Sequence, residues 1–270
     1  MWLPWDYSLL LAGGFLVVRW SVLRWRPVQS DAIAAFLREA TIVAALYTCW
    51  QVAGRLSVIQ IDDAVTRGIA VWDLERALYL PSEATAQQHL LPHGLAVQAS
   101  NIYYAGFHVP GMGIFLLWMF VRHREYYPRW RNALAGLTAV CLLIQLVPVA
   151  PPRLIPELGL VDTGILYGQS VYATMGSTSA GQLQAMPSLH VGWAALVAVA
   201  AAVTSTSRWR WIGFGHAVLT FYVVAVTGNH YWLDGIVAIV LLAPIAVLTH
   251  QVAERRITRQ MSQFLPDSAD

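Results

Sequence analysis

The chain has 270 residues, of which 57% are hydrophobic and only 12% charged, and this balance excludes an ordinary soluble globular protein. The formal net charge of +2 is too small to predict nucleic-acid binding. All 17 basic residues are Arg, which fits a GC-rich bacterial source. We therefore expect an all-α integral membrane protein with no nucleic-acid partner.

Apolar stretches recur along the chain, each long enough or nearly long enough to cross a bilayer. Their lengths predict about seven transmembrane helices. The stretches cover residues 7–23, 36–56, 96–121, 132–150, 189–206, 211–227 and 233–250.

The loop charges predict an orientation. Arg clusters follow the first, third, fifth and seventh apolar stretches, whereas the alternate connections carry acidic residues and few Arg. By the positive-inside rule, the N-terminus lies outside and the C-terminus lies in the cytoplasm. A helical pattern near residues 70–80, in the long outer connection 57–95, predicts an interfacial helix that acts as a lid or spacer without a direct chemical role.

Three polar motifs fall on the predicted outer side, within residues 151–153, 186–190 and 229–234. The first follows the fourth stretch, the second enters the fifth, and the third joins the sixth to the seventh. The topology therefore predicts that they converge. Polar and ionisable residues near membrane depth are rare without a function, so we expect a site there.

The residue types in these motifs suit phosphoryl chemistry. His190 follows a predicted helix start at Ser188, where free backbone N–H groups favour an anion. His230 and Asp234 are four residues apart, so a helix beginning near residue 229 would let the carboxylate orient the imidazole as a nucleophile. Arg153 carries a planar guanidinium group whose N–H groups can donate to two phosphate oxygens at once.

Pro-Ser-Leu-His, followed some forty residues later by His-x-x-x-Asp and preceded by Pro-Pro-Arg, resembles the type 2 phosphatidic acid phosphatase superfamily, in particular its inositol phosphorylceramide synthase-like branch of membrane phosphotransferases. The resemblance implies that His230 is the nucleophile, His190 the acid and Asp234 the carboxylate that orients the nucleophile. It also implies that Arg153 and Ser188 bind phosphate, and that no metal or other cofactor is needed.

The same resemblance divides the chain. Residues 1–30 are expected to form an extra N-terminal transmembrane helix, and residues 31–250 a catalytic membrane domain whose six helices form the phosphatidic acid phosphatase-like core. Residues 251–270 are expected to be a cytoplasmic tail.

The sequence departs from the superfamily at four positions. Leu146 replaces a Lys of the first motif, and Leu189 replaces the glycine of the second. Val223 and Val224 replace a Ser-Arg pair ahead of the nucleophile. With fewer cations, the site suits a phosphodiester or diphosphate better than a phosphomonoester dianion.

Two further groups of polar residues lie within the apolar stretches. Asn101, Tyr104 and His108 recur at positions i, i+3 and i+7 of the third stretch, which places them on one face of a continuous helix. They form part of the substrate pocket or make hydrogen bonds that fix the helix bundle. We expect His216, in the sixth stretch, to lie too far from the outer motifs to join them.

Together these patterns predict an enzyme of the bacterial cell membrane with an extracytoplasmic active site and a membrane lipid as substrate. It transfers a phosphoryl-bearing group through a phosphohistidine to an inositol-like or other polyol acceptor. The alternative is a phosphatase that hydrolyses a lipid or polyprenyl phosphate or diphosphate. A third possibility is a non-catalytic lipid transporter or scaffold. Neither the lipid nor the oligomeric state can be predicted from the sequence.

Overall fold

The computed structural model describes residues 4–25, 30–56, 63–170 and 182–264. Within these ranges the regular secondary structure is helical, with one isolated bridge between Val149 and Gln184, which confirms the predicted fold class. The elements are α1 (Trp5–Trp25), α2 (Ser30–Leu56), α3 (Ala64–Ala77), α4 (Glu83–Leu90), α5 (Gly94–Gly106), α6 (His108–Arg122), α7 (Tyr127–Ile144), η2 (Pro152–Leu154), η3 (Pro156–Leu158), α8 (Thr163–Leu166), α10 (Leu189–Thr204), α11 (Arg210–Val226) and α12 (Trp232–Phe264).

Each apolar stretch predicted as a span is helical. Length and composition alone identify three described helices that could cross a membrane (α1, α2 and α12), or four if the pair α5 and α6 counts as one span. Helices α10 and α11 are apolar but shorter, with 16 and 17 residues. They pack against each other, and α10 also packs against α12 and α7.

The third predicted span is two helices rather than one. Helix α5 ends at Gly106, α6 begins at His108, and the two meet at an angle of 55°. The expectation that Asn101, Tyr104 and His108 share one face of a continuous helix is therefore wrong. Gly106 and Pro110 flank the bend, and both residue types disfavour an uninterrupted helix.

The main core lies where α6, α7, α10 and α12 meet. Ala133, Leu137 and Cys141 on α7 are completely buried, as are Leu196 and Ala200 on α10. The small residues among them, Ala133, Cys141 and Ala200, let the helix backbones approach closely, which is how helices associate within a bilayer.

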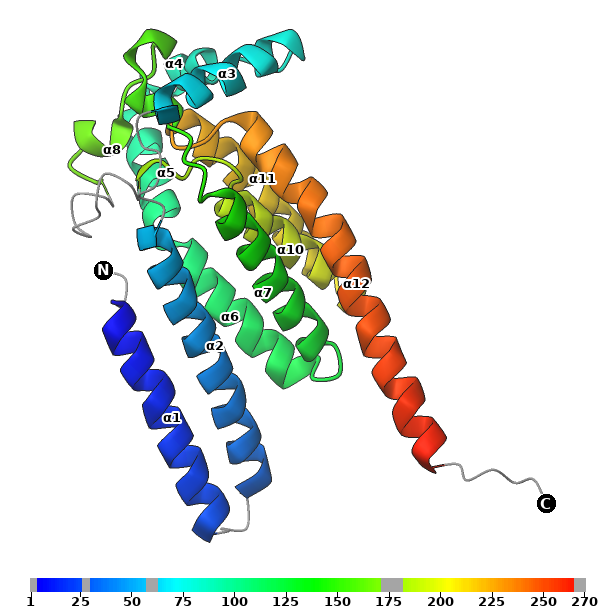
Figure 1. The fold of residues 1–270 in the computed structure, drawn as a ribbon. Helices are drawn as coiled ribbons and strands as arrows, with labels where there is room; N and C mark the ends of the chain where they lie inside the picture. The colour runs from blue at the N-terminus through cyan, green and yellow to red at the C-terminus, as the bar shows by residue number, and fades with distance from the viewer. Residues whose placement is uncertain (1–3, 26–29, 57–62, 171–181, 265–270) are drawn as a thin grey trace.

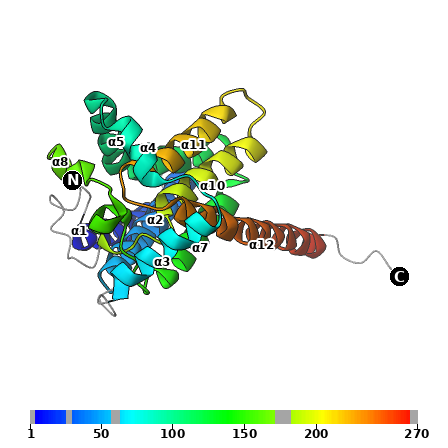
Figure 2. The ribbon, with the colours of Figure 1, turned by 90° about the horizontal axis from the view of Figure 1, so that it is seen from above.

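A second core lies at one end of the molecule, where α3 and α4 lie beside the first turn of α12 (Figure 1, Figure 2). Ala64 of α3 packs with Ala150, Ile155 and Tyr231 from connections far apart in the sequence. The Ala150 N–H donates to the carbonyl of Ala64 at 3.0 Å. This second core is what brings the three polar motifs together.

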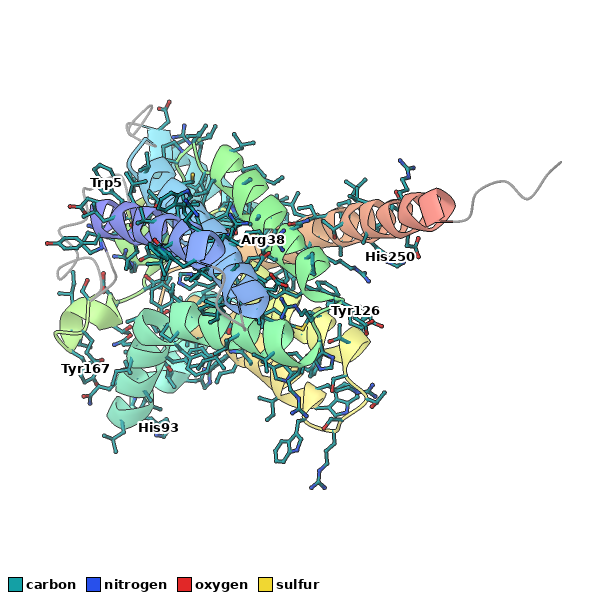
Figure 3. All side chains as sticks on the ribbon, turned by 90° about the horizontal axis from the view of Figure 1, so that it is seen from below. Trp5, Arg38, His93, Tyr126, Tyr167 and His250 are labelled. Atoms are coloured by element: carbon teal, nitrogen blue, oxygen red, sulfur yellow. The ribbon has the colours of Figure 1, made fainter. Side chains whose placement is uncertain are left out.

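Helices α1 and α2 form a hairpin beside this bundle (Figure 1). The Ser8 and Thr48 hydroxyls share a buried hydrogen bond of 2.8 Å within the hairpin. An ion pair between Glu39 of α2 and Arg131 of α7 joins the hairpin to the bundle. At the far side, α12 extends beyond the other helices and carries His250 on its projecting part (Figure 3).

Candidate active site

His230 lies in the turn between α11 and α12 and is only 4% exposed. Its Nδ1 is 2.7 Å from the carbonyl oxygen of Ala185 and 3.2 Å from Oδ2 of Asp234. The carbonyl oxygen of Ala185 can only accept a hydrogen bond, and so can an ionised Asp234. Nδ1 therefore carries the hydrogen and donates it. This leaves the lone pair on Nε2, the nitrogen that could act as a nucleophile.

The predicted pairing of His230 with Asp234 is present, but its geometry differs from the expectation. Helix α12 begins at Trp232, so His230 lies before the helix and only Asp234 lies in its first turn. The Tyr231 N–H donates to Oδ2 of Asp234 at 2.9 Å, which holds the turn in place. Burial lowers the pKa of His230 to about 4; the hydrogen bond to Ala185 opposes this shift and the Arg153 charge adds to it. His230 is therefore neutral near pH 7.

His190 is the second residue of α10, and the predicted helix start is present. Ser188 is the N-cap, with its hydroxyl accepting from the Val191 N–H at 3.4 Å. The ring centroid of His190 is 5.6 Å from that of His230. The backbone N–H of Ser188 donates to the carbonyl of Asp234, which ties the start of α10 to the start of α12.

Arg153 is held in η2 with a side chain only 2% exposed. Its Nε donates to Oδ1 of Asn229 at 2.9 Å, and its Nη1 donates to Oδ2 of Asp162 at 2.6 Å. These residues and Tyr104 line a cavity of about 20 Å³, room for about one water molecule. A phosphate oxygen at Arg153 would share the guanidinium with the Asp162 carboxylate.

The three candidate pocket residues do not act as one group. Tyr104 and His108 each have a ring centroid 4.5 Å from that of His190, so both are walls of the site. Asn101 instead donates to the carbonyl of Thr163 at 2.9 Å and accepts from the Thr163 hydroxyl at 2.7 Å. Asn101 therefore fixes α8 to α5, as the alternative of a bundle-fixing hydrogen bond predicted.

His216 lies closer to the site than we expected. Its ring centroid is 5.8 Å from that of His108, which in turn contacts His190. The hydroxyl of Tyr103 forms a hydrogen bond with Nδ1 of His216. The bend after α5 turns Tyr103 and His108 toward α11, a geometry that helical periodicity could not predict.

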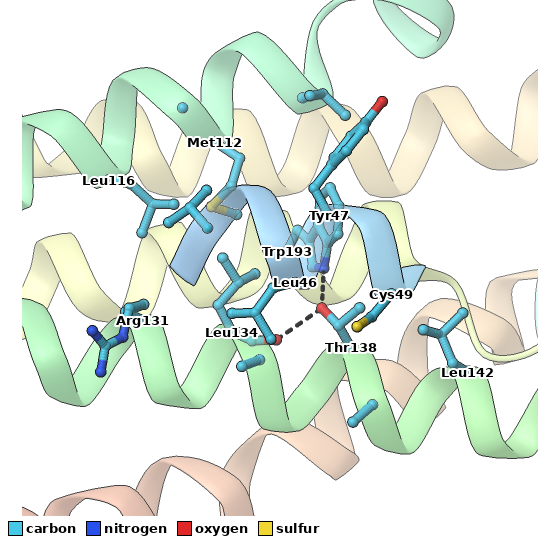
Figure 4. A pocket seen from close by; sticks show the side chains of 15 residues that line it. Leu46, Tyr47, Cys49, Met112, Leu116, Arg131, Leu134, Thr138, Leu142 and Trp193 are labelled. Atoms are coloured by element: carbon cyan, nitrogen blue, oxygen red, sulfur yellow. Dashed lines mark hydrogen bonds between the residues drawn. The ribbon is translucent and has the colours of Figure 1, made fainter. Parts of the chain in front are cut away.

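An apolar pocket of about 230 Å³ is lined by residues of α2, α6, α7 and α10 (Figure 4). Val109 and Met112 of α6 and Trp193 of α10 line it, one turn or less beyond His108 and His190. Figure 4 shows Arg131 at one end and Leu142 at the other. The indole N–H of Trp193 donates to the Thr138 hydroxyl at 3.0 Å, so no unpaired polar group from this Trp faces the pocket.

Two residues near the site could not be found from the sequence, Glu75 and Glu83, which accept from backbone N–H groups in the first turn of α12. In the sequence they appear only as acidic residues of an outer connection. Their burial distinguishes them, because both side chains are completely inaccessible to solvent. Asp162 and Asn229 hold Arg153.

These features define a class of protein: a helical membrane protein whose polar site pairs a carboxylate-held histidine with a second histidine. A family model described as the PAP2 superfamily matches residues 69–248. Because this match covers more than half of the chain, the protein belongs to the PAP2 superfamily, whose members are phosphatases and phosphotransferases. No curated protein and no solved structure matched the chain. Helices α1 and α2 precede the matched residues.

Proposed function

We propose that this protein takes a phosphoryl-bearing group from a membrane lipid and passes it to an alcohol through a phosphohistidine on His230. The observation that carries the proposal is the double hold on Nδ1 of His230 by Ala185 and Asp234, which directs the Nε2 lone pair to the reaction. His190, with its ring centroid 5.6 Å away, is close enough to serve the leaving oxygen of a phosphate bound between the two rings.

The proposed reaction has two steps. In the first, Nε2 of His230 attacks phosphorus, the bond from phosphorus to the leaving oxygen breaks, and that oxygen takes a proton from His190, which is protonated when the anionic lipid is bound beside it. In the second, His190 removes a proton from the acceptor hydroxyl, whose oxygen attacks phosphorus and breaks the phosphorus–nitrogen bond. Asp234 stabilises the positive charge that His230 carries between the steps. Arg153 and Ser188 bind the phosphate oxygens.

The apolar pocket supports a lipid substrate. A dry apolar cavity of about 150 Å³ can hold a molecule the size of benzene. A cavity of about 230 Å³ therefore accommodates a segment of hydrocarbon chain. Trp193 lies three residues after His190 on α10 and Met112 four residues after His108 on α6, so one chain of the lipid can enter the pocket while the headgroup reaches His230. The pocket residues Leu46 and Gly113 are exposed, which gives the chain a path from the bilayer.

The small number of cationic side chains in the site supports a donor lipid with one negative charge at the attacked phosphorus. Val223 and Val224 are buried in α11 where superfamily members carry Ser-Arg, and Arg153 already shares its charge with Asp162. A phosphodiester donor and an inositol-like acceptor fit this balance, as in the inositol phosphorylceramide synthase-like branch. Hydrolysis of a lipid or polyprenyl diphosphate is the alternative.

The loop charges support a cell-membrane location with the site on the extracytoplasmic side. The Arg cluster 122–131 spans the end of α6, the connection and the start of α7, and this region lies at the opposite end from α3 and α4 (Figure 1). The N-terminus is then outside and the C-terminus cytoplasmic.

The test is product identification with purified protein. Phospholipids, lipid phosphates and a polyprenyl diphosphate are incubated with and without inositol, and products are identified by mass spectrometry. A new inositol-containing phosphodiester supports transfer, whereas free phosphate or diphosphate cleavage alone supports the alternative. His230→Ala should abolish either reaction, and His250→Ala, a change of an exposed histidine on α12, should not. Equal activity of His230→Ala and wild type would exclude the mechanism.

A further inference from the structure

Two buried glutamates from outside the catalytic motifs hold the first turn of α12. The Leu233 N–H donates to Oε1 of Glu75 at 2.6 Å, and the Trp232 N–H donates to Oε1 of Glu83 at 3.1 Å. Glu75 lies on α3 and Glu83 begins α4, so both acceptors come from the outer helices that cover the site. Both side chains are completely buried.

These bonds replace an ordinary local helix cap. The first N–H groups of a helix have no partner within it, and a side chain of the preceding residue usually accepts from one of them. Here Tyr231 precedes α12, and its hydroxyl donates instead to the carbonyl of Ala150 at 2.9 Å. The two distant glutamates and Asp234 therefore accept from three successive N–H groups, those of residues 231 to 233.

The outer helix α3 lies directly on this turn. A Cβ added to Gly68 would be 2.7 Å from the Tyr231 hydroxyl oxygen and 2.7 Å from the Ala150 carbonyl oxygen. Both approaches are closer than real Cβ atoms allow, so a glycine is required for α3 to reach its place. The helix that the sequence predicted as a lid or spacer is thus packed against the residue that follows His230.

The charges around the two glutamates are unbalanced. Nη2 of Arg76 is 3.3 Å from Oε2 of Glu83 and 3.6 Å from Oε2 of Glu75, so one cation faces two carboxyl groups. Asp234 and the Tyr231 hydroxyl face the same space from α12 and its preceding turn. Burial, the hydrogen bond to Glu83 and its charge raise the pKa of Glu75 to about 9, and the bond from Leu233 opposes this shift. At pH 7, Glu75 is therefore protonated, and Glu83 lies beside it within ion-pair distance of Arg76.

We propose that Glu75 and Glu83 are positioning residues of the active site, which hold the first turn of α12 so that Asp234 and His230 keep their reacting geometry. The proposal rests on the proposed function, because it assigns the residues a role in that reaction. They act through the backbone N–H groups of Trp232 and Leu233 and do not touch the phosphate. When Glu75 ionises, a negative charge is added beside the carboxyl groups of Glu83 and Asp234, and the turn loosens.

The experiment uses full-length protein and compares Glu75→Gln, Glu75→Ala and Glu83→Gln with wild type. The control is Glu157→Gln, a change of an exposed acidic residue in the outer region. Two quantities are measured between pH 6 and pH 10: the kcat and KM for the lipid identified above, and hydrogen exchange in the peptide 228–236. Thermal stability is measured alongside.

Wild-type kcat should fall as the pH rises through about 9, and Glu75→Gln, which cannot ionise, should remove this fall while staying within about threefold of wild type at pH 7. Glu75→Ala should lower kcat about tenfold with little change in KM, because the Leu233 N–H loses its acceptor. Glu83→Gln should lower kcat by a similar factor, because Arg76 loses its carboxylate partner. Hydrogen exchange in the peptide 228–236 should become faster in each variant, and at each pH, in which kcat falls.

Identical pH profiles for wild type and Glu75→Gln would overturn the proposal, as would a drop in thermal stability with unchanged kcat in all three variants. If wild type turns over no lipid, the proposed function fails separately. Exchange in 228–236 then decides alone, and exchange that is independent of Glu75 and of pH overturns the positioning role.

Discussion

Replacing Asp234 by Asn isolates what the carboxylate contributes beyond orienting His230. In a triad where the carboxylate alone holds the histidine tautomer, such a change lowers kcat about 10⁴-fold. Here the Ala185 carbonyl oxygen, at 2.7 Å from Nδ1, is a second acceptor that no side-chain substitution removes. The tautomer should therefore survive in Asp234→Asn.

What the variant loses is the charge that stabilises a positively charged His230 during phosphoryl transfer. A hydrogen bond to a charged group contributes about 1.5–3 kcal/mol. Since 1.36 kcal/mol corresponds to a factor of ten in rate, we expect kcat to fall about 10- to 100-fold. The amide oxygen of Asn can still accept from the Tyr231 N–H, which Asp234 now does at 2.9 Å, so the fold should be retained.

The assay is single-turnover formation of labelled phosphohistidine at pH 7, with thermal stability measured in parallel. Asp73→Asn serves as the matched control, because Asp73 is an exposed carboxylate on α3 in the same outer region. A 10⁴-fold loss in Asp234→Asn would refute the argument, because it would mean that Ala185 does not hold the tautomer. A loss below about threefold would show that the charge has no role.

Three other predictions follow from the site. Gly113→Leu adds a side chain to the apolar pocket, at a position where a Cβ meets nothing within 4 Å. It should raise KM about tenfold for long-chain lipids and leave KM for short-chain phosphates unaffected. Gly13→Leu, on the exposed face of α1, is the control, and equal effects of the two variants would refute the binding of a lipid chain in the pocket. Asp162→Asn keeps the N-cap of α8 but removes the charge beside Arg153, so KM for an anionic lipid should fall about threefold, and a rise would contradict competition for the guanidinium. The pKa of His230 is lowered to about 4 in the folded state, so the unfolded chain binds more protons between pH 4 and pH 6.5; the free energy of unfolding should therefore decrease as the pH falls through this window, and His230→Gln should flatten that dependence in denaturant titrations.

Helix positions and the convergence of the motifs were predictable because they follow from short-range rules. An apolar stretch must form a helix in a bilayer, and alternating helices carry every second connection to the same side. Ser188 as the N-cap of α10 is a local preference that the sequence shows directly. The pairing of His230 with Asp234 follows from their spacing, although the helix begins two residues later than their shared face required.

Errors arose where a contact depends on residues far apart in the chain. The break between α5 and α6 separates Asn101 and Tyr104 from His108, although the three residues fit one helical period. His216 lies near the site because Tyr103 on α5 and His108 on α6 both face it across the break.

The sequence by itself determined that the chain lies in a bilayer, that it is helical and which residue types form the site. These properties depend on composition, spacing and the cost of unpaired polar groups in a bilayer. Only the tertiary structure decided which polar atoms meet. Ala185 holds His230 across 45 positions of the chain, and Glu75 reaches Leu233 across 158. Such contacts depend on how the outer helices pack on the bundle, and periodicity carries no information about packing between elements so far apart.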